Sequence, residues 1–228
     1  MNSQFDRHAR TYDEDLKQAL SITGESRHFF AQRRVTFLAQ CLQKLGEKPR
    51  FGVDYGCGTG DTTELLRQVL RLDSVTGLDV SRKSLEIARS SHKSPHCHFL
   101  DPGEYGPPDT NDLAYCNGVF HHILKAERPA ALSYIRDCLR PGGVLALWEN
   151  NPLNPGTRYV MSRCEFDRDA IPVASREARK LLLESGFQIL SVNFLFLFPR
   201  FLRKLRVIEP YVSALPFGAQ YQVLGRKR

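Results

Sequence analysis

Long apolar runs and paired cysteines are both missing from this sequence of 228 residues. No stretch approaches the roughly 18 to 20 consecutive apolar residues that a membrane-spanning helix needs, and Met1 to Arg10 hold no apolar signal-peptide core. The six cysteines stand singly, without a C-x-x-C pair, so we expect neither disulfides nor a cysteine zinc site. These absences predict a cytoplasmic protein with reduced thiols.

The positive charge of the chain is concentrated near its C-terminal end. The formal net charge is +7, and residues 192–228 hold seven Lys and Arg against one acid, Glu209, so this segment carries +6 of it. The remaining residues are nearly neutral, and the 42% of hydrophobic residues in the whole chain is typical of a globular domain. An anionic partner would therefore meet the C-terminal segment.

Short apolar strands alternate with helices along most of the chain, which is the pattern of an α/β sheet. We expect strands at 50–55, 74–80, 96–100, 112–119, 143–148, 187–198 and 220–225. Helices are expected at 26–45, 61–72, 81–91, 128–139 and 175–185, with a Pro- and Asn-rich loop before the last of them. Residues 1–228 are predicted to form a single domain, with residues 1–46 as a helical N-terminal extension and residues 47–228 as the core.

A glycine-rich turn, Gly56-Cys57-Gly58-Thr59-Gly60, follows the first strand and opens a helix. Glycines at such a turn let the backbone approach a ligand closely. Asp79 ends the second strand, where a carboxylate can accept hydrogen bonds from both hydroxyls of a ribose. A dinucleotide fingerprint begun at Gly56 would need Gly or Ala where Asp61 stands, so the spacing favours a nucleoside cofactor other than NAD.

Three segments resemble motifs of the class I S-adenosylmethionine-dependent methyltransferase superfamily. Asp54 to Gly60 is similar to its D-x-G-x-G-x-G motif, Gly77 to Ser81 to its ribose-binding strand end, and Leu139 to Leu145 to the turn before its fifth strand. The resemblance implies a Rossmann-like, seven-stranded, mostly parallel sheet with an antiparallel last strand and helices on both faces. It also implies S-adenosylmethionine as the cofactor, in contact with Asp54, Gly56, Cys57, Gly58, Gly60, Asp79, Val80, Asp101 and Asn117.

The segment Phe5 to Asp13 resembles the opening of the small-molecule branch of that superfamily, which includes quinone-biosynthesis methyltransferases. In that branch the segment forms a lid over the cofactor, which implies that Tyr12 closes on the sulfonium. The alternative is an amphipathic helix that simply packs on the domain.

The ends of the fourth and fifth strands are the expected place of the methyl acceptor. His121 and His122 follow the fourth strand and Glu149 ends the fifth, so these three residues are the catalytic candidates. The alternative is that both histidines are structural. Three amides after the fifth strand are expected to line the acceptor pocket or to form a turn: Asn150, Asn151 and Asn154.

Nucleic acid and metal ions are both disfavoured as partners. The fourth strand lacks the Asn/Asp-Pro-Pro-aromatic and Pro-Cys signatures of enzymes that methylate nucleobases. His96 and His98 share one strand face, but no third ligand is evident, so no metal is assigned.

Residues 199–210 are predicted to form a short amphipathic helix. At about 100° per residue its apolar side chains share one face and its basic side chains gather opposite. The two sets are Phe201, Leu202, Leu205 and Ile208 against Arg200, Arg203 and Lys204. The pattern suits peripheral contact with a membrane or a cover over a hydrophobic acceptor. The alternative is a helix packed on the core with a solvated basic face.

The sequence therefore predicts an S-adenosylmethionine-dependent methyltransferase that acts on oxygen, carbon or nitrogen of a small, lipophilic, lipid-like molecule. Two alternatives stay open. The basic segment would suit an RNA methyltransferase. The other alternative is a cofactor-binding or membrane-associated regulator that catalyses no reaction, because no catalytic base is assured.

Overall fold

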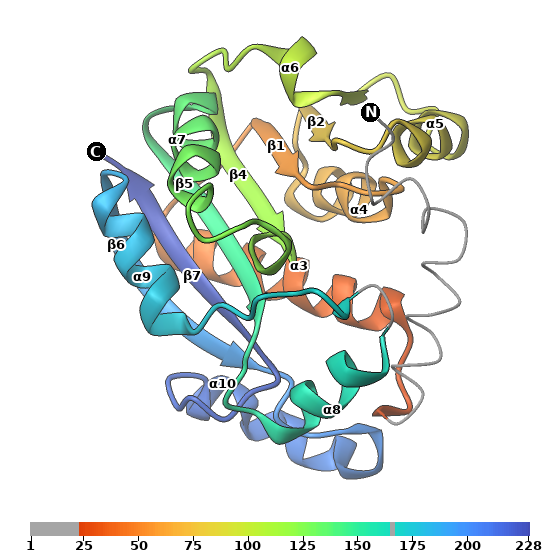
Figure 1. The fold of residues 1–228 in the computed structure, drawn as a ribbon, viewed down its shortest axis with the longest axis vertical. Coiled ribbons are helices and arrows are strands. Elements are labelled where there is room, and N and C mark those ends of the chain that lie inside the picture. Colours follow the sequence, from red (N-terminus) through yellow and green to blue (C-terminus); the bar gives the residue numbers. More distant parts are fainter. Residues whose placement is uncertain (1–22, 165–166) are drawn as a thin grey trace.

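The computed structural model describes residues 23–164 and 167–228 of the chain, and these residues build one seven-stranded sheet. The strand order is β3-β2-β1-β4-β5-β7-β6, and only β7 runs antiparallel to its neighbours (Figure 1). The strands are β1 (Phe51–Tyr55), β2 (Ser74–Leu78), β3 (Cys97–Leu100), β4 (Asn111–Asn117), β5 (Leu139–Asn150), β6 (Phe187–Leu195) and β7 (Gln220–Lys227). The predicted Rossmann-like fold is confirmed.

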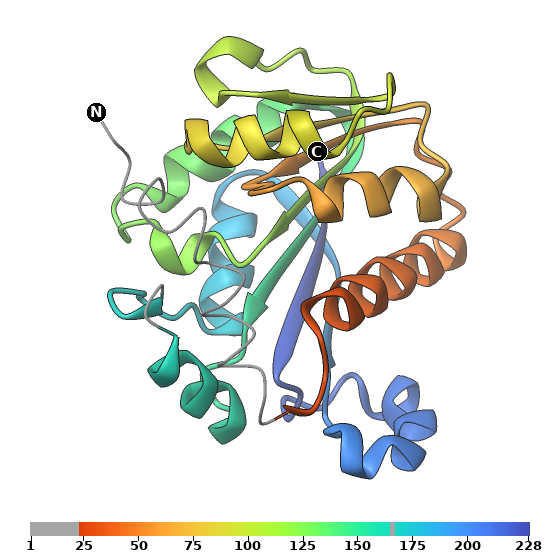
Figure 2. The same cartoon turned by 90° about the vertical axis from the view of Figure 1, so that its right-hand side faces the viewer.

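Helices cover both faces of the sheet (Figure 2). One face carries α3 (Arg27–Lys44), α4 (Asp61–Leu70) and α5 (Arg82–Ser91), and the other carries α7 (Arg128–Cys138) and α9 (Ser175–Glu184). Tyr115 and Trp148 pack on the α3 side, whereas Cys116 and Leu147, each one residue away, pack on the α7 side. Because successive side chains of a strand point to opposite faces, the buried strands are apolar almost continuously.

Two helices lie where the sequence predicted loops. The segment after β5 was read as a Pro- and Asn-rich loop, but it contains α8 (Pro155–Arg163), and α6 (Pro102–Tyr105) follows β3. Asn154 caps α8, since its side chain accepts a hydrogen bond from Thr157 N at 2.9 Å, and Pro155 occupies the first turn. An Asn cap followed by Pro is a helix-start signal as well as a turn signal, which explains the error.

The segment between β6 and β7 differs most from its prediction. It forms the 3₁₀ helix η4 (Arg200–Ile208) and the short α10 (Glu209–Val212), and no residue of η4 is buried. Phe201 is 81% exposed and Val207 is 70% exposed, so the alternative of an apolar face packed on the core is wrong. The tighter 3₁₀ winding and a non-helical Leu202 also break the face that was predicted at α-helical spacing.

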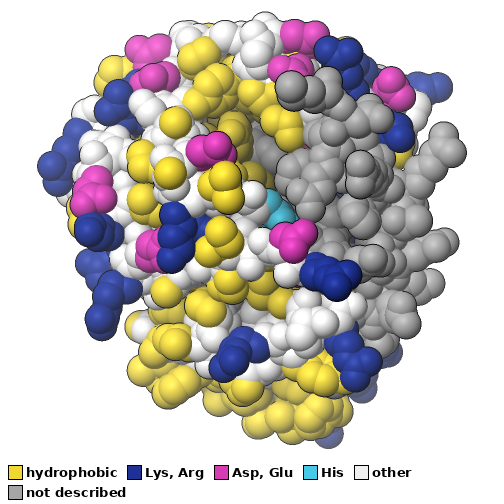
Figure 3. Space-filling model, in the orientation of Figure 1, with side chains coloured by type: hydrophobic (Ala, Val, Ile, Leu, Met, Phe, Trp, Pro, Cys, Tyr) yellow, Lys and Arg dark blue, Asp and Glu magenta, His cyan; other side chains and the backbone are white. Residues whose placement is uncertain are grey.

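Polar contacts hold this segment on the domain instead. The buried Glu209 carboxylate accepts hydrogen bonds from Leu197 N at 3.1 Å and Phe198 N at 3.2 Å, and it pairs with Arg33 of α3 at 3.1 Å. Arg206 donates to Phe198 O and pairs with Glu25. The apolar side chains of η4 are therefore left facing outward on a well-anchored segment, at the lower end of the molecule in Figure 3.

Within the described part of the chain, no helix combines the length and the apolar character needed to cross a bilayer.

Candidate active site

The glycine-rich turn between β1 and α4 is held open by backbone conformation and by one carboxylate. Gly56, Gly58 and Gly60 all have positive φ, a region that side chains disfavour. Asp79 accepts hydrogen bonds from Gly58 N and Ser81 N, each at 2.8 Å. The end of β2 and the turn after β1 are thus joined directly.

The three glycines have different surroundings. A Cβ on Gly56 would strike Val119, and one on Gly60 would approach Phe99 Cε1 to 2.7 Å, so both positions are closely packed. A Cβ on Gly58 would meet nothing within 4 Å, since this residue faces open space. Gly58 is therefore the position at which a ligand can approach the backbone.

Asp54 lies beneath this turn and is almost completely buried. Burial raises its pKa to about 7, although Thr63 Oγ1 donates a hydrogen bond to Asp54 Oδ2 at 2.7 Å and lowers it in part. Cys57 is buried beside it, and burial raises the pKa of its thiol well above the usual value. This thiol is therefore a poor nucleophile.

A cavity of about 830 Å³ opens at the carboxyl ends of β1, β2, β4 and β5. Figure 3 shows a hollow on this face with a histidine side chain visible inside it. Nine of the residues singled out from the sequence line it: Asp54, Gly56, Cys57, Gly58, Asp79, Val80, Asn117, His121 and His122. Residues far apart in the sequence are therefore brought to one place.

Three of the cofactor and catalytic candidates, Gly60, Asp101 and Glu149, do not line the cavity. Gly60 lies behind the turn against Phe99, and the Asp101 side chain caps α6 by accepting a hydrogen bond from Gly103 N at 2.8 Å. Glu149 lies behind His121. Tyr12 falls outside the described residues.

The histidine pair lies on the 3₁₀ turn η2 (Phe120–His122), directly after β4. Glu149 Oε2 lies 2.6 Å from His121 Nδ1, and Oε1 accepts a hydrogen bond from Phe120 N at 2.7 Å. On its other side, His121 Nε2 lies 3.4 Å from Asp167 Oδ1. Burial alone would lower the pKa of His121, but the Glu149 and Asp167 carboxylates raise it to about 10.

His122 has the opposite electrostatic environment. Burial, and next the neighbouring charge of His121, lower its pKa to about 4. The His121 and His122 rings lie 4.1 Å apart, so the two imidazoles interact directly. Asp167, which contacts both, was missed from the sequence because it follows α8 and no local motif marks it.

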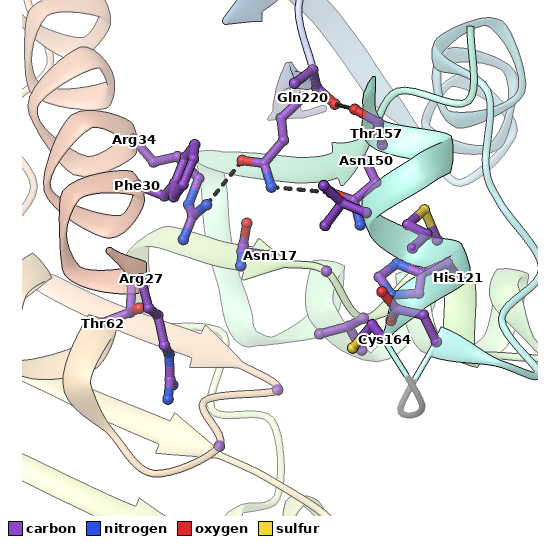
Figure 4. A pocket seen from close by; sticks show the side chains of 18 of the residues that line it. Arg27, Phe30, Arg34, Thr62, Asn117, His121, Asn150, Thr157, Cys164 and Gln220 are labelled. Carbon is purple, nitrogen blue, oxygen red and sulfur yellow. Dashed lines mark hydrogen bonds and ion pairs between the residues drawn. The ribbon is translucent and has the colours of Figure 1, made fainter. Parts of the chain in front are cut away.

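A hydrogen-bonded chain of side chains forms another wall of the cavity (Figure 4). Arg34 donates from Nε to the Tyr115 hydroxyl at 3.2 Å and from Nη1 to Gln220 Oε1 at 2.9 Å. Gln220 Nε2 in turn donates to Asn150 Oδ1 at 3.1 Å. Arg34 and Gln220 were not predicted from the sequence. The helical spacing of Arg27, Phe30 and Arg34, which places all three on one face of α3, is the signal that could have indicated Arg34.

The amides after β5 divide between the cavity and the scaffold. Asn150 and Asn154 line the cavity. Asn151 is buried and donates hydrogen bonds to Pro216 O at 3.0 Å and Gly218 O at 2.8 Å, so its role is to join the ends of β5 and β7. His96 and His98 are both exposed.

Comparison with known proteins agrees with this geometry. Residues 53–145, which span the glycine-rich turn, Asp79 and the first half of β5, match the family model described as a methyltransferase domain. This match agrees with the predicted class I S-adenosylmethionine-dependent methyltransferase superfamily. The comparisons agree with the predictions of this superfamily and of S-adenosylmethionine as the cofactor.

Sequence relatives include trans-aconitate 2-methyltransferases. The protein from Rhizobium leguminosarum bv. trifolii is 37% identical over 117 residues, which cover 50% of this chain and 44% of that protein. The one from Sinorhizobium medicae is 32% identical over 153 residues, which cover 65% and 56% of the two chains. The chain spans about half the length of the curated relatives it matches.

Solved structures share the fold of this chain. An S-adenosylmethionine-dependent methyltransferase from Mesorhizobium loti has a TM-score of 0.58 at 20% identity, over 79% of this chain and 91% of that chain. The magnesium protoporphyrin IX methyltransferase from Synechocystis PCC 6803 with bound S-adenosylmethionine has a TM-score of 0.62 at 19% identity, over 100% and 93% of the two chains.

Proposed function

We propose that this chain transfers the methyl group of S-adenosylmethionine to a small, lipophilic acceptor. The observation that carries the proposal is a single cavity in which the glycine-rich turn and Asp79 face the histidine pair after β4. Its volume of about 830 Å³ lies within the range of small-molecule sites, and it can hold two reactants side by side. Such positioning is what an in-line methyl displacement requires.

The cofactor is proposed to lie across the ends of β1, β2 and β4. The Asp79 carboxylate would accept hydrogen bonds from the ribose hydroxyls, and the open face of Gly58 would admit the methionine portion. Val80 and Asn117 line the cavity on either side of this path. Gly60 and Asp101 would act through the shape of their loops, and Tyr12 is proposed to cover the sulfonium.

The acceptor is proposed to occupy the part of the cavity between η2 and α3. Apolar side chains from four segments line it: Phe29, Phe30, Val119, Ile123, Val160, Met161, Phe196 and Phe198. The Arg34, Gln220 and Asn150 chain supplies one polar wall, and His121 and His122 supply another. An acceptor with an apolar body and a polar reacting end fits this lining, with oxygen, carbon or nitrogen as the methylated atom.

The two histidines are proposed to act on the acceptor, and Glu149 is a positioning residue. Glu149 touches no part of the cavity, but it fixes the ring of His121 through a 2.6 Å contact and fixes the η2 backbone through Phe120 N. The relatives named for trans-aconitate support a small-molecule acceptor with polar groups.

A membrane is proposed as the source of a lipid-like acceptor. The chain that leads into η4 lines the cavity with Phe196 and Phe198, and η4 begins with Phe201 at the cavity and then carries exposed apolar residues beside exposed Arg203 and Lys204. Apolar side chains next to cationic ones are complementary to an anionic bilayer surface. The acceptor could then enter the cavity along this segment.

Calorimetric titration with S-adenosylmethionine and S-adenosylhomocysteine tests the proposed function. Wild type should bind both, and Asp79→Asn should bind at least ten-fold more weakly, because one carboxylate oxygen becomes an amide. Glu86→Gln, an exposed charge removal on α5, is the control and should leave binding unchanged. Thermal unfolding of Asp79→Asn shows whether the turn stays folded. No cofactor binding by wild type would overturn the proposal, and binding without methyl transfer to any acceptor would favour a regulator.

A further inference from the structure

His121, His122 and Asp167 bring three ligand atoms together on one wall of the cavity. His121 Nε2 lies 3.4 Å and His122 Nε2 lies 3.6 Å from the same oxygen, Asp167 Oδ1. Ligand atoms from all three residues lie within 4.8 Å of one another. All three residues line the cavity, and Figure 4 places His121 on the side away from Arg27 and Thr62.

The two distances to Asp167 Oδ1 match the spacing of metal ligands better than that of hydrogen bonds. A direct N–H···O hydrogen bond spans about 2.7 to 3.2 Å, and both distances to Asp167 are longer. Nitrogen and oxygen ligands lie about 2.0 to 2.2 Å from a tetrahedral zinc ion, and the edge of a tetrahedron is about 1.6 times that distance, or roughly 3.3 to 3.6 Å. The observed 3.4 and 3.6 Å fall in this range.

The surroundings fix His121 in the orientation of a metal ligand. Its Nδ1 lies 2.6 Å from Glu149, which leaves Nε2 directed at Asp167. A carboxylate on the outer nitrogen of a histidine is the usual support of metal-binding imidazoles. The backbone is also fixed, because His121 O accepts a hydrogen bond from Ile171 N at 2.7 Å and Arg128 Nη2 donates to Ile171 O at 2.7 Å.

The charges of the cluster favour a cation. The Glu149 and Asp167 carboxylates flank two imidazoles, and their side chains are 0% and 12% exposed. Without the proton that His121 shares with these carboxylates, two negative charges would remain in a place with little water. A divalent ion would balance both charges and would take the place of a proton between His121 and Asp167.

We propose that His121, His122 and Asp167 bind one divalent transition metal ion, with zinc the best match to the ligands and their spacing. Three protein ligands leave a fourth position open, as in catalytic zinc sites. No metal site was predicted from the sequence, because His96 and His98 have no third ligand near them. Asp167 belongs to a segment distant from His121 and His122. The proposal concerns metal binding alone and does not depend on methyl transfer.

The consequence of this metal site for the reaction rests on the proposed function. An acceptor hydroxyl bound at the open position would lose its proton to water more readily. Its oxygen would then form the bond to the methyl carbon, while the electron pair of the breaking C–S bond stays on sulfur. A metal ion at this place would therefore favour acceptors that carry an oxygen at or next to the methylated atom.

Metal titration of the full chain, with any purification tag removed and bound metal stripped by a chelator, tests the proposal. We expect one equivalent of Zn²⁺ to bind with micromolar or tighter affinity in calorimetry, and Co²⁺ to give visible absorption bands of a tetrahedral site. His122→Gln and Asp167→Asn should each weaken Zn²⁺ binding at least ten-fold. His98→Gln removes an exposed histidine from β3 and should change nothing.

The outcomes separate this proposal from the proposed function. No stoichiometric Zn²⁺ or Co²⁺ binding by wild type, or binding that survives in both Asp167→Asn and His122→Gln, overturns the metal site. S-adenosylhomocysteine binding by the same variants shows that they are folded. A protein that binds Zn²⁺ but no S-adenosylhomocysteine would keep the metal site and lose the proposed function.

Discussion

The two ends of the cavity are built in different ways. In the cofactor half, which comprises the glycine-rich turn, Asp54 and the ends of β1 and β2, the contacts are made by residues close in sequence. Thr63 bonds to Asp54, and Asp79 bonds to Gly58. In the acceptor half, which comprises η2, the ends of β5 and β7, α8 and Asp167, the contacts join distant segments, such as Arg34 with Gln220.

The match to the family model follows this division only in part. The family model covers residues 53–145 and therefore ends before Glu149, α8 and Asp167. The match therefore covers the cofactor half and, of the acceptor half, the η2 turn. A compact local motif can be kept while the long-range contacts around it change, because the sheet supports both independently.

Removal of Arg128 should have the largest effect on stability. This fully buried side chain donates hydrogen bonds to Phe120 O, Ile123 O and Ile171 O and pairs with Glu177, so it ties the acceptor half together. Arg128→Met leaves buried carbonyls without donors and should lower the free energy of unfolding by about 3 to 5 kcal/mol in urea titrations.

Two further measurements test the comparison between the two halves of the cavity. Arg136→Met, which removes a half-exposed arginine from the same helix, is the matched control and should cost less than about 1 kcal/mol. Folded Arg128→Met should still bind S-adenosylhomocysteine, since the cofactor half is built locally. Equal losses of stability in the two variants would contradict the role given to Arg128.

Asp54 should make the cofactor half lose stability as pH rises. Burial raises its pKa from an ordinary carboxyl value to about 7, so the folded protein holds a proton that the unfolded chain has released. The contribution of Asp54 to stability should therefore fall between about pH 4 and pH 7, by about 2 to 4 kcal/mol. Asp54→Asn should abolish this dependence in urea titrations across that range.

A second carboxylate provides a control of opposite sign. Burial alone would raise the pKa of Asp112, but the bonds to Arg140 and to the Phe51 and Arg50 amides hold it below the usual value. Its contribution is present above about pH 4 and is lost as pH falls below that value. In Asp112→Asn, the loss of stability below about pH 4 should become smaller, and the pH dependence between pH 4 and 7 should stay as in wild type. A change between pH 4 and 7 in this variant would contradict the assignment of that dependence to Asp54.

The sequence predicted the cofactor half far better than the acceptor half, for a physical reason. Strand and helix periodicity and the positive-φ glycines are local signals, so all seven strands and the turn from Gly56 to Gly60 were found. Asp167, Arg34 and Gln220 reach the cavity only through tertiary packing, which no local pattern encodes. The sequence left open whether the apolar face of residues 199–210 is exposed, because amphipathic spacing predicts which residues share a face and not whether that face is covered.

The smallest expected effect concerns the surface beside the acceptor half. Arg203→Glu/Lys204→Glu reverses two exposed charges on η4 and should weaken co-sedimentation with liposomes that contain anionic lipid by at least ten-fold, since each basic residue near such a surface contributes about 1 kcal/mol. Arg179→Glu/Lys180→Glu on α9 makes the same change of charge away from the cavity and should bind like wild type. If the two double variants bind equally well, η4 is not the membrane contact, and a lipid-like acceptor must reach the acceptor half by another path. A loss confined to the η4 variant would instead connect the acceptor half to the membrane surface.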